Sequence, residues 1–359
     1  MRGGPFPQTV SSAAVGAAAE ADNRVHRWPL TPRITRWLRT KGADARLAGF
    51  EADRAALGVE VERDARGDLV MTVPAEAGRL VGPGYPDRAG KPRLGRLTTR
   101  PGVAIPARTG CPGQDSSRPA VTDDAWVLWI HGGGFCWGSA RDGTGLRLAA
   151  GLGRPVVSVE YPLAPEARFP AAIDACLEAY LTGVAERGPR VLLGGVSAGA
   201  NLALGVLQRI RALRAAGEGP PLPLGVVALT PFGDLAGEGD SYRVNEGRDA
   251  YLRWRGQQER FARAYAGRAD LRDPLVSPVH AQWSGEALPP AIFTTGTRDL
   301  FLSDTARIHT AWRAAGGEAD LVLAEGLWHS YLSDARLPES AALMVRLLDW
   351  CEDVLGRDC

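Results

Sequence analysis

A serine lies in the pattern Gly195-Val-Ser-Ala-Gly199, directly after an apolar run and directly before a helix-forming run. Small residues around the serine allow the sharp strand-to-helix turn that exposes a nucleophilic hydroxyl. A glycine-rich turn with a capping serine would give the same letters. The position between a strand and a helix favours the first interpretation, so Ser197 is predicted to be a nucleophile.

A serine nucleophile needs a general base, and the chain has five histidines. His329 follows the last apolar run and a turn at Glu325-Gly326, where a loop from the strand ends would reach the serine. The other four are less suitable: His26 in the N-terminal arm, His131 in a glycine-rich loop whose shape it is expected to hold, His280 before a strand, and His309 inside a helical run. We therefore predict that His329 is the base.

The third member of such a triad is an acid that lies between the serine and the histidine in sequence, at the end of a strand. Asp299 follows an apolar run through Gly296-Thr-Arg298, and Asp304 comes five residues later at the start of a helical run. Asp304 is expected to satisfy N–H groups of that first helical turn. Asp299 is therefore the preferred acid, and the order Ser197, Asp299, His329 is the alpha/beta-hydrolase order.

A second glycine cluster, His131-Gly-Gly-Gly134, directly follows another apolar run. Successive glycines expose N–H groups that can stabilise the oxyanion of a tetrahedral intermediate, together with the N–H of Ala198. A phosphate-binding loop is the alternative interpretation. It is disfavoured because the GxGxxG spacing and a following GK[ST] are both missing.

These residues need a scaffold, and apolar runs alternate with helical runs from residue 126 onward. Strands are predicted at 126–130, 155–159, 190–193, 224–229, 291–295 and 319–323, and helices at 171–186, 200–216, 303–315 and 338–355. This alternation predicts an α/β fold whose mostly parallel central sheet is covered by helices on both faces. No internal repeat is seen.

The N-terminal third is less regular. Residues 1–25 are rich in Gly, Ala and Ser and are expected to form a loose arm, and 33–57 to form one or two short helices. Residues 83–119 are rich in Pro, Gly and Arg and are expected to form an irregular connection with short strands at most.

The composition excludes several classes of protein. The 359 residues carry 42 Lys and Arg against 41 Asp and Glu, so no basic excess exists for nucleic-acid binding. No apolar run is long enough for a membrane span. Five scattered cysteines without CxxC spacing indicate reduced thiols and a cytoplasmic location, and no metal-ligand spacing is seen. No metal and no cofactor are therefore expected.

The motifs together resemble the hormone-sensitive-lipase-like branch of the alpha/beta hydrolases, the bacterial carboxylesterases and lactone hydrolases. The resemblance rests on residues 131–134, 160–166 with 169–172, 195–203, 273–278, 296–304 and 328–329, which follow the family's order over 125–355. It implies the alpha/beta-hydrolase fold and the oxyanion donors Gly133, Gly134 and Ala198. Two departures are Val196, where Asp, Glu or Thr is usual, and Glu160-Tyr-Pro162, where Asp-Tyr-Arg is usual.

The resemblance also implies a helical cap over the site. The cap would combine an insertion at about 235–285 with N-terminal helices in 1–57, and 58–359 would form the catalytic domain. Phe135 and Trp137 flank Cys136, which is expected to be a small buried filler rather than a reactive thiol. Both aromatic residues are expected either to line the acyl pocket or to pack in the core. Glu166 and Asp174 are expected to be structural supports.

The predicted function is a serine esterase that cleaves esters of short to medium acyl chain through an acyl-enzyme. A lactonase, thioesterase or formamidase could use the same triad. A silent small-molecule receptor on a hydrolase fold is the alternative of another class, and it is disfavoured because His329 is present in its motif. The expected partner is a small ester or lactone. A homodimer is compatible with the sequence.

Overall fold

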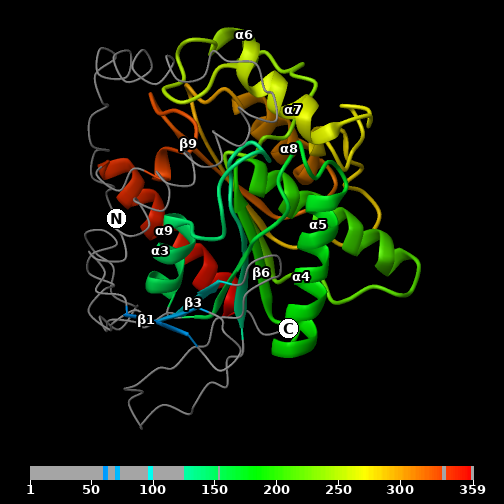
Figure 1. Cartoon of the computed structure of the whole chain (residues 1–359), viewed down its shortest axis with the longest axis vertical. Helices are drawn as coiled ribbons and strands as arrows, with labels where there is room; N and C mark the ends of the chain where they lie inside the picture. Colours follow the sequence, from blue (N-terminus) through cyan, green and yellow to red (C-terminus); the bar gives the residue numbers. More distant parts are fainter. Residues whose placement is uncertain are drawn as a thin grey trace.

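The computed structural model describes residues 60–63, 69–72, 96–99, 125–152, 154–333 and 337–356. Its centre is a nine-stranded sheet with the order β1-β2-β3-β5-β4-β6-β7-β8-β9 (Figure 1). The arm and the helices expected within residues 1–57 lie outside the described residues. The alpha/beta-hydrolase architecture predicted from the sequence, a mostly parallel sheet with helices on both faces, is confirmed.

The sheet combines an antiparallel edge with a parallel body. The strands are β1 Glu60–Arg63, β2 Leu69–Thr72, β3 Arg96–Thr99, β4 Trp126–Ile130, β5 Val156–Val159, β6 Val191–Val196, β7 Gly225–Leu229, β8 Ala291–Gly296 and β9 Ala319–Ala324. β1, β2 and β3 pair antiparallel, and every pairing from β3 to β9 is parallel. The six strands expected from residue 126 onward are all present, and β3 is a short strand within the segment expected to be irregular.

Helices connect the parallel strands. They are α3 Gly143–Leu152, α4 Ala171–Arg187, α5 Ala198–Ala215, α6 Ser241–Val244, α7 Glu259–Ala266, α8 Leu302–Ala314 and α9 Pro338–Leu355. Shorter helical turns are η2 Trp254–Gln258, η3 Pro278–His280 and η4 Tyr331–Ser333. The four predicted helices are present, and α3 is an additional helix that the sequence pattern did not predict.

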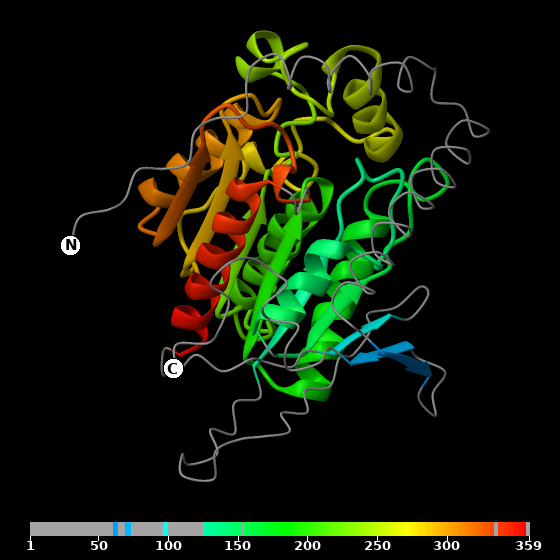
Figure 2. The ribbon, with the colours of Figure 1, turned by 90° about the vertical axis from the view of Figure 1, so that its left-hand side faces the viewer.

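Two hydrophobic cores lie on opposite faces of the sheet, as the alternation of side chains along a strand requires. In β4, Trp126, Leu128 and Ile130 join the core that includes α4, α5 and α8, whereas Val127 and Trp129 join the core that includes α3 and α9. Figure 2 shows α3 and α9 in front of the sheet. Both faces of the parallel strands are thus buried, which explains their continuous apolar sequences.

Residues 235–285, the predicted cap insertion, contain α6 and α7. Both helices lie beyond one end of the sheet, at the top of Figures 1 and 2. Hydrogen bonds that Asn245 donates and Asp249 accepts join this segment to the loops that follow β8 and β9, so it lies at the carboxyl end of the parallel strands. Within the described residues, no helix has the length and apolar character needed to cross a membrane.

Candidate active site

Ser197 lies at the turn between β6 and α5, as the glycine pattern predicts. Its backbone has φ 59° and ψ −121°, a conformation that residues with a side chain rarely adopt. The turn is held because the Ser197 N–H donates to the Leu229 carbonyl at 2.8 Å, and the Ser197 carbonyl accepts from the Phe232 N–H at 3.2 Å. The strain is therefore supported by the neighbouring strand β7 and the loop after it.

The glycines around Ser197 are required by close packing. A Cβ on Gly195 would lie 2.4 Å from the backbone carbon of Gly199. A Cβ on Gly199 would lie 2.0 Å from the Ile130 carbonyl oxygen at the end of β4. These contacts let α5 begin directly against the strands, so the serine is presented at their carboxyl ends.

His329 and Asp299 complete a chain of hydrogen bonds with Ser197. The Ser197 Oγ lies 2.9 Å from His329 Nε2, and His329 Nδ1 lies 3.1 Å from Asp299 Oδ1. All three side chains are buried, with Ser197 8% and His329 4% exposed. The structure thus brings together the three residues predicted as a triad. With Nδ1–H donating to the carboxylate, Nε2 is the acceptor that can take the serine proton.

The Asp299 carboxylate is itself fixed by its neighbours. Its Oδ1 also accepts the Phe301 N–H at 2.9 Å, and its Oδ2 accepts the Thr295 hydroxyl at 3.0 Å. The ring of Phe301 packs edge-on against His329, with centroids 4.9 Å apart. These contacts orient both the acid and the imidazole.

The hydrogen-bond partners of Asp304 differ from those predicted. Its Oδ1 has no hydrogen-bond partner among the described residues, so the carboxylate does not cap the first turn of α8. Instead, its Oδ2 accepts the N–H groups of Gly233 and Asp234 and the hydroxyl of Tyr242. Burial and the charge of Asp234 raise the pKa of the Asp304 carboxyl well above its usual value. Asp304 therefore anchors the loop after β7, which the local sequence could not show.

The glycine loop after β4 packs directly against Ser197. A Cβ on Gly132 would lie 2.8 Å from the Val196 carbonyl oxygen and 3.1 Å from the Ser197 Cβ. Gly133 and Gly134 have φ values of 124° and 57°, which only glycine adopts readily. The loop that carries Gly133 and Gly134 therefore begins in contact with the Ser197 turn.

Ala198, the third predicted oxyanion donor, directly follows Ser197. It is the first residue of α5, and N–H groups in the first helical turn have no acceptor within the helix. The positive end of the helix dipole also lies there. Ala198 thus lies at the Ser197 turn itself, and Gly133 and Gly134 directly follow Gly132, which packs against that turn; their role as oxyanion donors stays a prediction.

His131 and Tyr161 stabilise the glycine loop. His131 Nδ1 lies 2.7 Å from the Gly132 carbonyl, and its ring stacks on Tyr161 at 4.2 Å. The Tyr161 hydroxyl donates to the His131 carbonyl at 3.0 Å. Glu160, at a position where the sequence departs from the family, accepts the Ala140 N–H at 2.8 Å, so this segment still supplies a support.

The two aromatic residues predicted for the substrate site differ in exposure. Phe135 is fully buried and stacks on Tyr265 with centroids 3.9 Å apart, so it belongs to the core. Trp137 is half-buried and packs against the same core. Phe261 of α7 lies against the glycine loop, because a Cβ on Gly134 would be 2.8 Å from its ring. The predicted cap insertion therefore contacts the loop of the oxyanion donors.

Two further residues of the insertion reach the triad loops. Asn245 donates to the Asp299 carbonyl at 2.8 Å, and Asp249 accepts the His329 N–H at 3.2 Å. Sequence reasoning did not single out either residue. The signal is tertiary, because both lie about 50 residues before Asp299 and no local motif links them.

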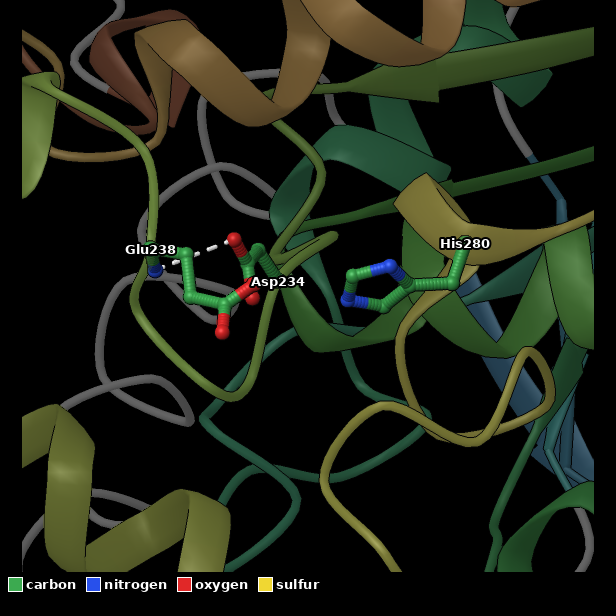
Figure 3. A group of neighbouring side chains, drawn as sticks. All are labelled: Asp234, Glu238 and His280. Carbon is green, nitrogen blue, oxygen red and sulfur yellow. Dashed lines mark hydrogen bonds between the residues drawn. The ribbon is translucent and has the colours of Figure 1, made fainter.

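A group with ligand-type atoms lies apart from the triad. Asp234, Glu238 and His280 bring one such atom each within 4.8 Å of one another (Figure 3). Spacing along the sequence did not reveal this group. Both carboxylates are already paired, Asp234 with Arg307 and Glu238 with Arg272. A cation would have to displace these arginines, so we assign no metal to the group.

Comparisons with known proteins agree with this architecture. A model of the alpha/beta hydrolase fold family matches residues 127–333, which include the whole Ser197, Asp299 and His329 group. An acetyl-hydrolase of Streptomyces hygroscopicus is 35% identical over 203 residues, which cover 55% of this chain and 65% of that protein. An esterase of Acinetobacter venetianus is 29% identical over 230 residues, covering 62% of this chain and 73% of that protein. The chain belongs to the alpha/beta hydrolase family.

A solved structure shows which branch of the family this chain resembles. An esterase of the bacterial hormone-sensitive lipase family superposes with a TM-score of 0.68 at 25% identity, covering 97% of this chain and 100% of that one. The resemblance to the hormone-sensitive-lipase-like branch, predicted from the motifs, is thereby confirmed.

Proposed function

We propose that the protein is a serine-dependent carboxylic ester hydrolase. The observation that carries the proposal is the continuous hydrogen-bond chain from the Ser197 hydroxyl through His329 to Asp299, with distances of 2.9 and 3.1 Å. Relatives named esterase and acetyl-hydrolase support the same class of reaction. The expected substrate is a small ester, and the expected location is the cytoplasm.

In the first half-reaction, His329 Nε2 takes the hydroxyl proton while the Ser197 Oγ attacks the ester carbonyl. Asp299 stabilises the imidazolium that forms and keeps Nδ1 protonated. The N–H groups of Gly133, Gly134 and Ala198 stabilise the negative charge on the carbonyl oxygen. The imidazolium then protonates the departing alcohol, which leaves an acyl group on Ser197.

The second half-reaction reverses these roles. His329 removes a proton from water, the hydroxide attacks the acyl carbonyl, and the carboxylic acid leaves as Ser197 recovers its proton. Every step uses groups of the chain, so no cofactor enters the mechanism. The same steps would open a lactone or cleave a thioester or formamide, and substrate profiling distinguishes these reactions.

Short to medium acyl chains are proposed because aromatic side chains crowd the glycine loop. Phe261 lies against Gly134, and the next residue of the loop, Phe135, stacks on Tyr265. The similarity to a protein named acetyl-hydrolase supports the same preference.

The test is a series of nitrophenyl esters from acetate to octanoate, with lactones beside it, on the wild type and on Ser197→Ala. We expect hydrolysis by the wild type and a loss of several orders of magnitude in kcat/KM in the variant, with unchanged melting. A fluorophosphonate should label the wild type and not Ser197→Ala. A variant that keeps the wild-type rate would contradict the assignment of Ser197, and no hydrolysis of any ester by the wild type would favour a silent receptor.

A further inference from the structure

We propose that Asp249 is a positioning residue for the reaction, because its buried carboxylate holds the loops that carry Asp299 and His329 in one arrangement. The inference rests on the proposed function and concerns a residue outside the triad. Asp249 lies in the segment after α6, within the predicted cap insertion.

Both oxygens of the Asp249 carboxylate accept hydrogen bonds. Its Oδ2 accepts the Leu300 N–H at 2.9 Å and the His329 N–H at 3.2 Å. Leu300 directly follows Asp299, so a single oxygen joins the backbone beside the acid to the backbone of the base. Its Oδ1 accepts the N–H groups of Tyr251 and Leu252 at 2.8 and 3.0 Å, which fixes the carboxylate to its own segment.

Asn245 contacts backbone carbonyl groups of the loop that carries Asp299. Its amide donates to the carbonyls of Asp299 at 2.8 Å and Thr297 at 3.2 Å. The Asp249 N–H donates to the Asn245 carbonyl at 3.2 Å, so the two residues form one local turn. Segment 245–252 therefore hydrogen-bonds to both N–H and carbonyl groups of the loop that carries Asp299. A displacement of this segment would change the distance between Asp299 and His329.

Asp249 also adds charge beside the triad. It is 1% exposed, and the titratable groups that act on it are Asp299 on the loop after β8 and His329 on the loop after β9. Burial and the charge of Asp299 raise the pKa of Asp249 to about 6, and the positive charge of His329 opposes the rise. Because the interaction is mutual, the Asp249 carboxylate stabilises the imidazolium that the mechanism forms.

An isosteric substitution separates these contributions from packing. In Asp249→Asn the shape is kept, but an NH₂ group faces backbone N–H groups on one side, and the charge is lost. The matched control is Asp240→Asn, the same change at an exposed position in the same insertion, where Asp240 pairs with Arg243.

We expect kcat for nitrophenyl butyrate to fall on the order of 10- to 100-fold in Asp249→Asn, with little change in KM. The acidic limb of the kcat/KM profile should also move to lower pH, because the imidazolium loses a stabilising carboxylate. A purely structural role would lower the rate or the melting temperature without moving that limb. Asp240→Asn should change neither quantity.

Three outcomes would overturn the proposal. In the first, Asp249→Asn behaves as Asp240→Asn does; in the second, Asp249→Asn has a lower rate but an unmoved acidic limb. In the third, neither Asp249→Asn nor the smaller Asp249→Ser folds. The last would make the carboxylate a requirement of folding. If only Asp249→Ser folds, the acidic limb of its kcat/KM profile is compared with that of the wild type instead. Failure of the proposed function itself is recognised separately, since Ser197→Ala would then retain the activity of the wild type.

Discussion

The Tyr242 hydroxyl donates to Asp304 Oδ2 at 2.7 Å, and this contact ties α6 to the first turn of α8. The same oxygen accepts two backbone N–H groups of the loop after β7. Asp304 is fully buried and hydrogen-bonds through Oδ2 to this anchor, whereas Asp299 faces the imidazole. The two acids of the 296–304 motif therefore serve different parts of the molecule.

Asp299→Asn and Asp304→Asn should consequently fail in different ways. Asp299→Asn should lower kcat about 10⁴-fold, because an amide can favour the wrong imidazole tautomer. Asp304→Asn should lower the melting temperature, because the amide oxygen would take the Oδ2 contacts and the NH₂ would be buried at the Oδ1 position, where no partner exists among the described residues. Kinetics of nitrophenyl butyrate hydrolysis and thermal unfolding of both variants check this. Equal kinetic losses with equal melting would leave the acid unassigned.

The size of the side chain at Phe261 should set the acyl-chain preference. Phe261→Leu removes part of a ring that lies against Gly134, so longer chains gain room beside the glycine loop. We expect the ratio of kcat/KM for octanoate to that for acetate to rise several-fold. The control is Phe293→Leu, the same change in β8, where the ring packs against Trp312. A similar rise in the control would mean that general loosening, not the contact with Gly134, changed the ratio.

Chelation should leave the activity unchanged. The candidate ligands Asp234 and Glu238 are each paired with an arginine, and no step of the proposed mechanism uses a cation. Dialysis against EDTA followed by the butyrate assay measures this directly. Loss of activity that returns with zinc would contradict the mechanism.

The stability of the wild type relative to Asp249→Asn should depend on pH. The pKa of Asp249 is about 6 in the folded protein, above its ordinary value of 3.8, so between these values the folded state holds the extra proton. This contribution to stability is full below the unfolded value and is lost as the pH rises through 6. Lowering the pH from 7 to 4 should therefore increase the stability of the wild type relative to the variant by about 2 kcal/mol. Urea unfolding of both proteins at the two pH values gives the difference, and a gap that stays constant would contradict the buried titration.

The parallel strands could be predicted because the apolar pattern within each strand reflects its burial. β4 and β7 are buried on both faces, so they read as continuous apolar runs. Helix α3 was missed because its sequence, GTGLRLAAGL, contains three glycines and has little helical propensity. Tertiary contacts support it, since Asp142 accepts both the Trp129 indole N–H and the Gly145 N–H at its start.

The candidate triad was accessible from sequence for a similar reason: each member follows a strand, and parallel strands bring their carboxyl ends together. The supporting residues were not accessible. Asp304 was misplaced as a helix cap, because its partners Gly233 and Tyr242 lie more than 60 residues away. Asn245 and Asp249 contact loops of the motifs, but they lie 50 or more residues before those loops in sequence. Long-range hydrogen bonds from single polar side chains leave no periodic pattern in the chain.

The hydrogen bonds of segment 245–252 set limits on how this enzyme can be recombined with its relatives. A chimera that exchanges the whole insertion at its sequence boundaries, near 235 and 285, would remove Asn245 and Asp249 along with α7. A graft that begins after Leu252 would leave those two residues in place and exchange only the aromatic helix against the glycine loop. Crossover points for altering substrate range therefore belong after Leu252, inside the insertion.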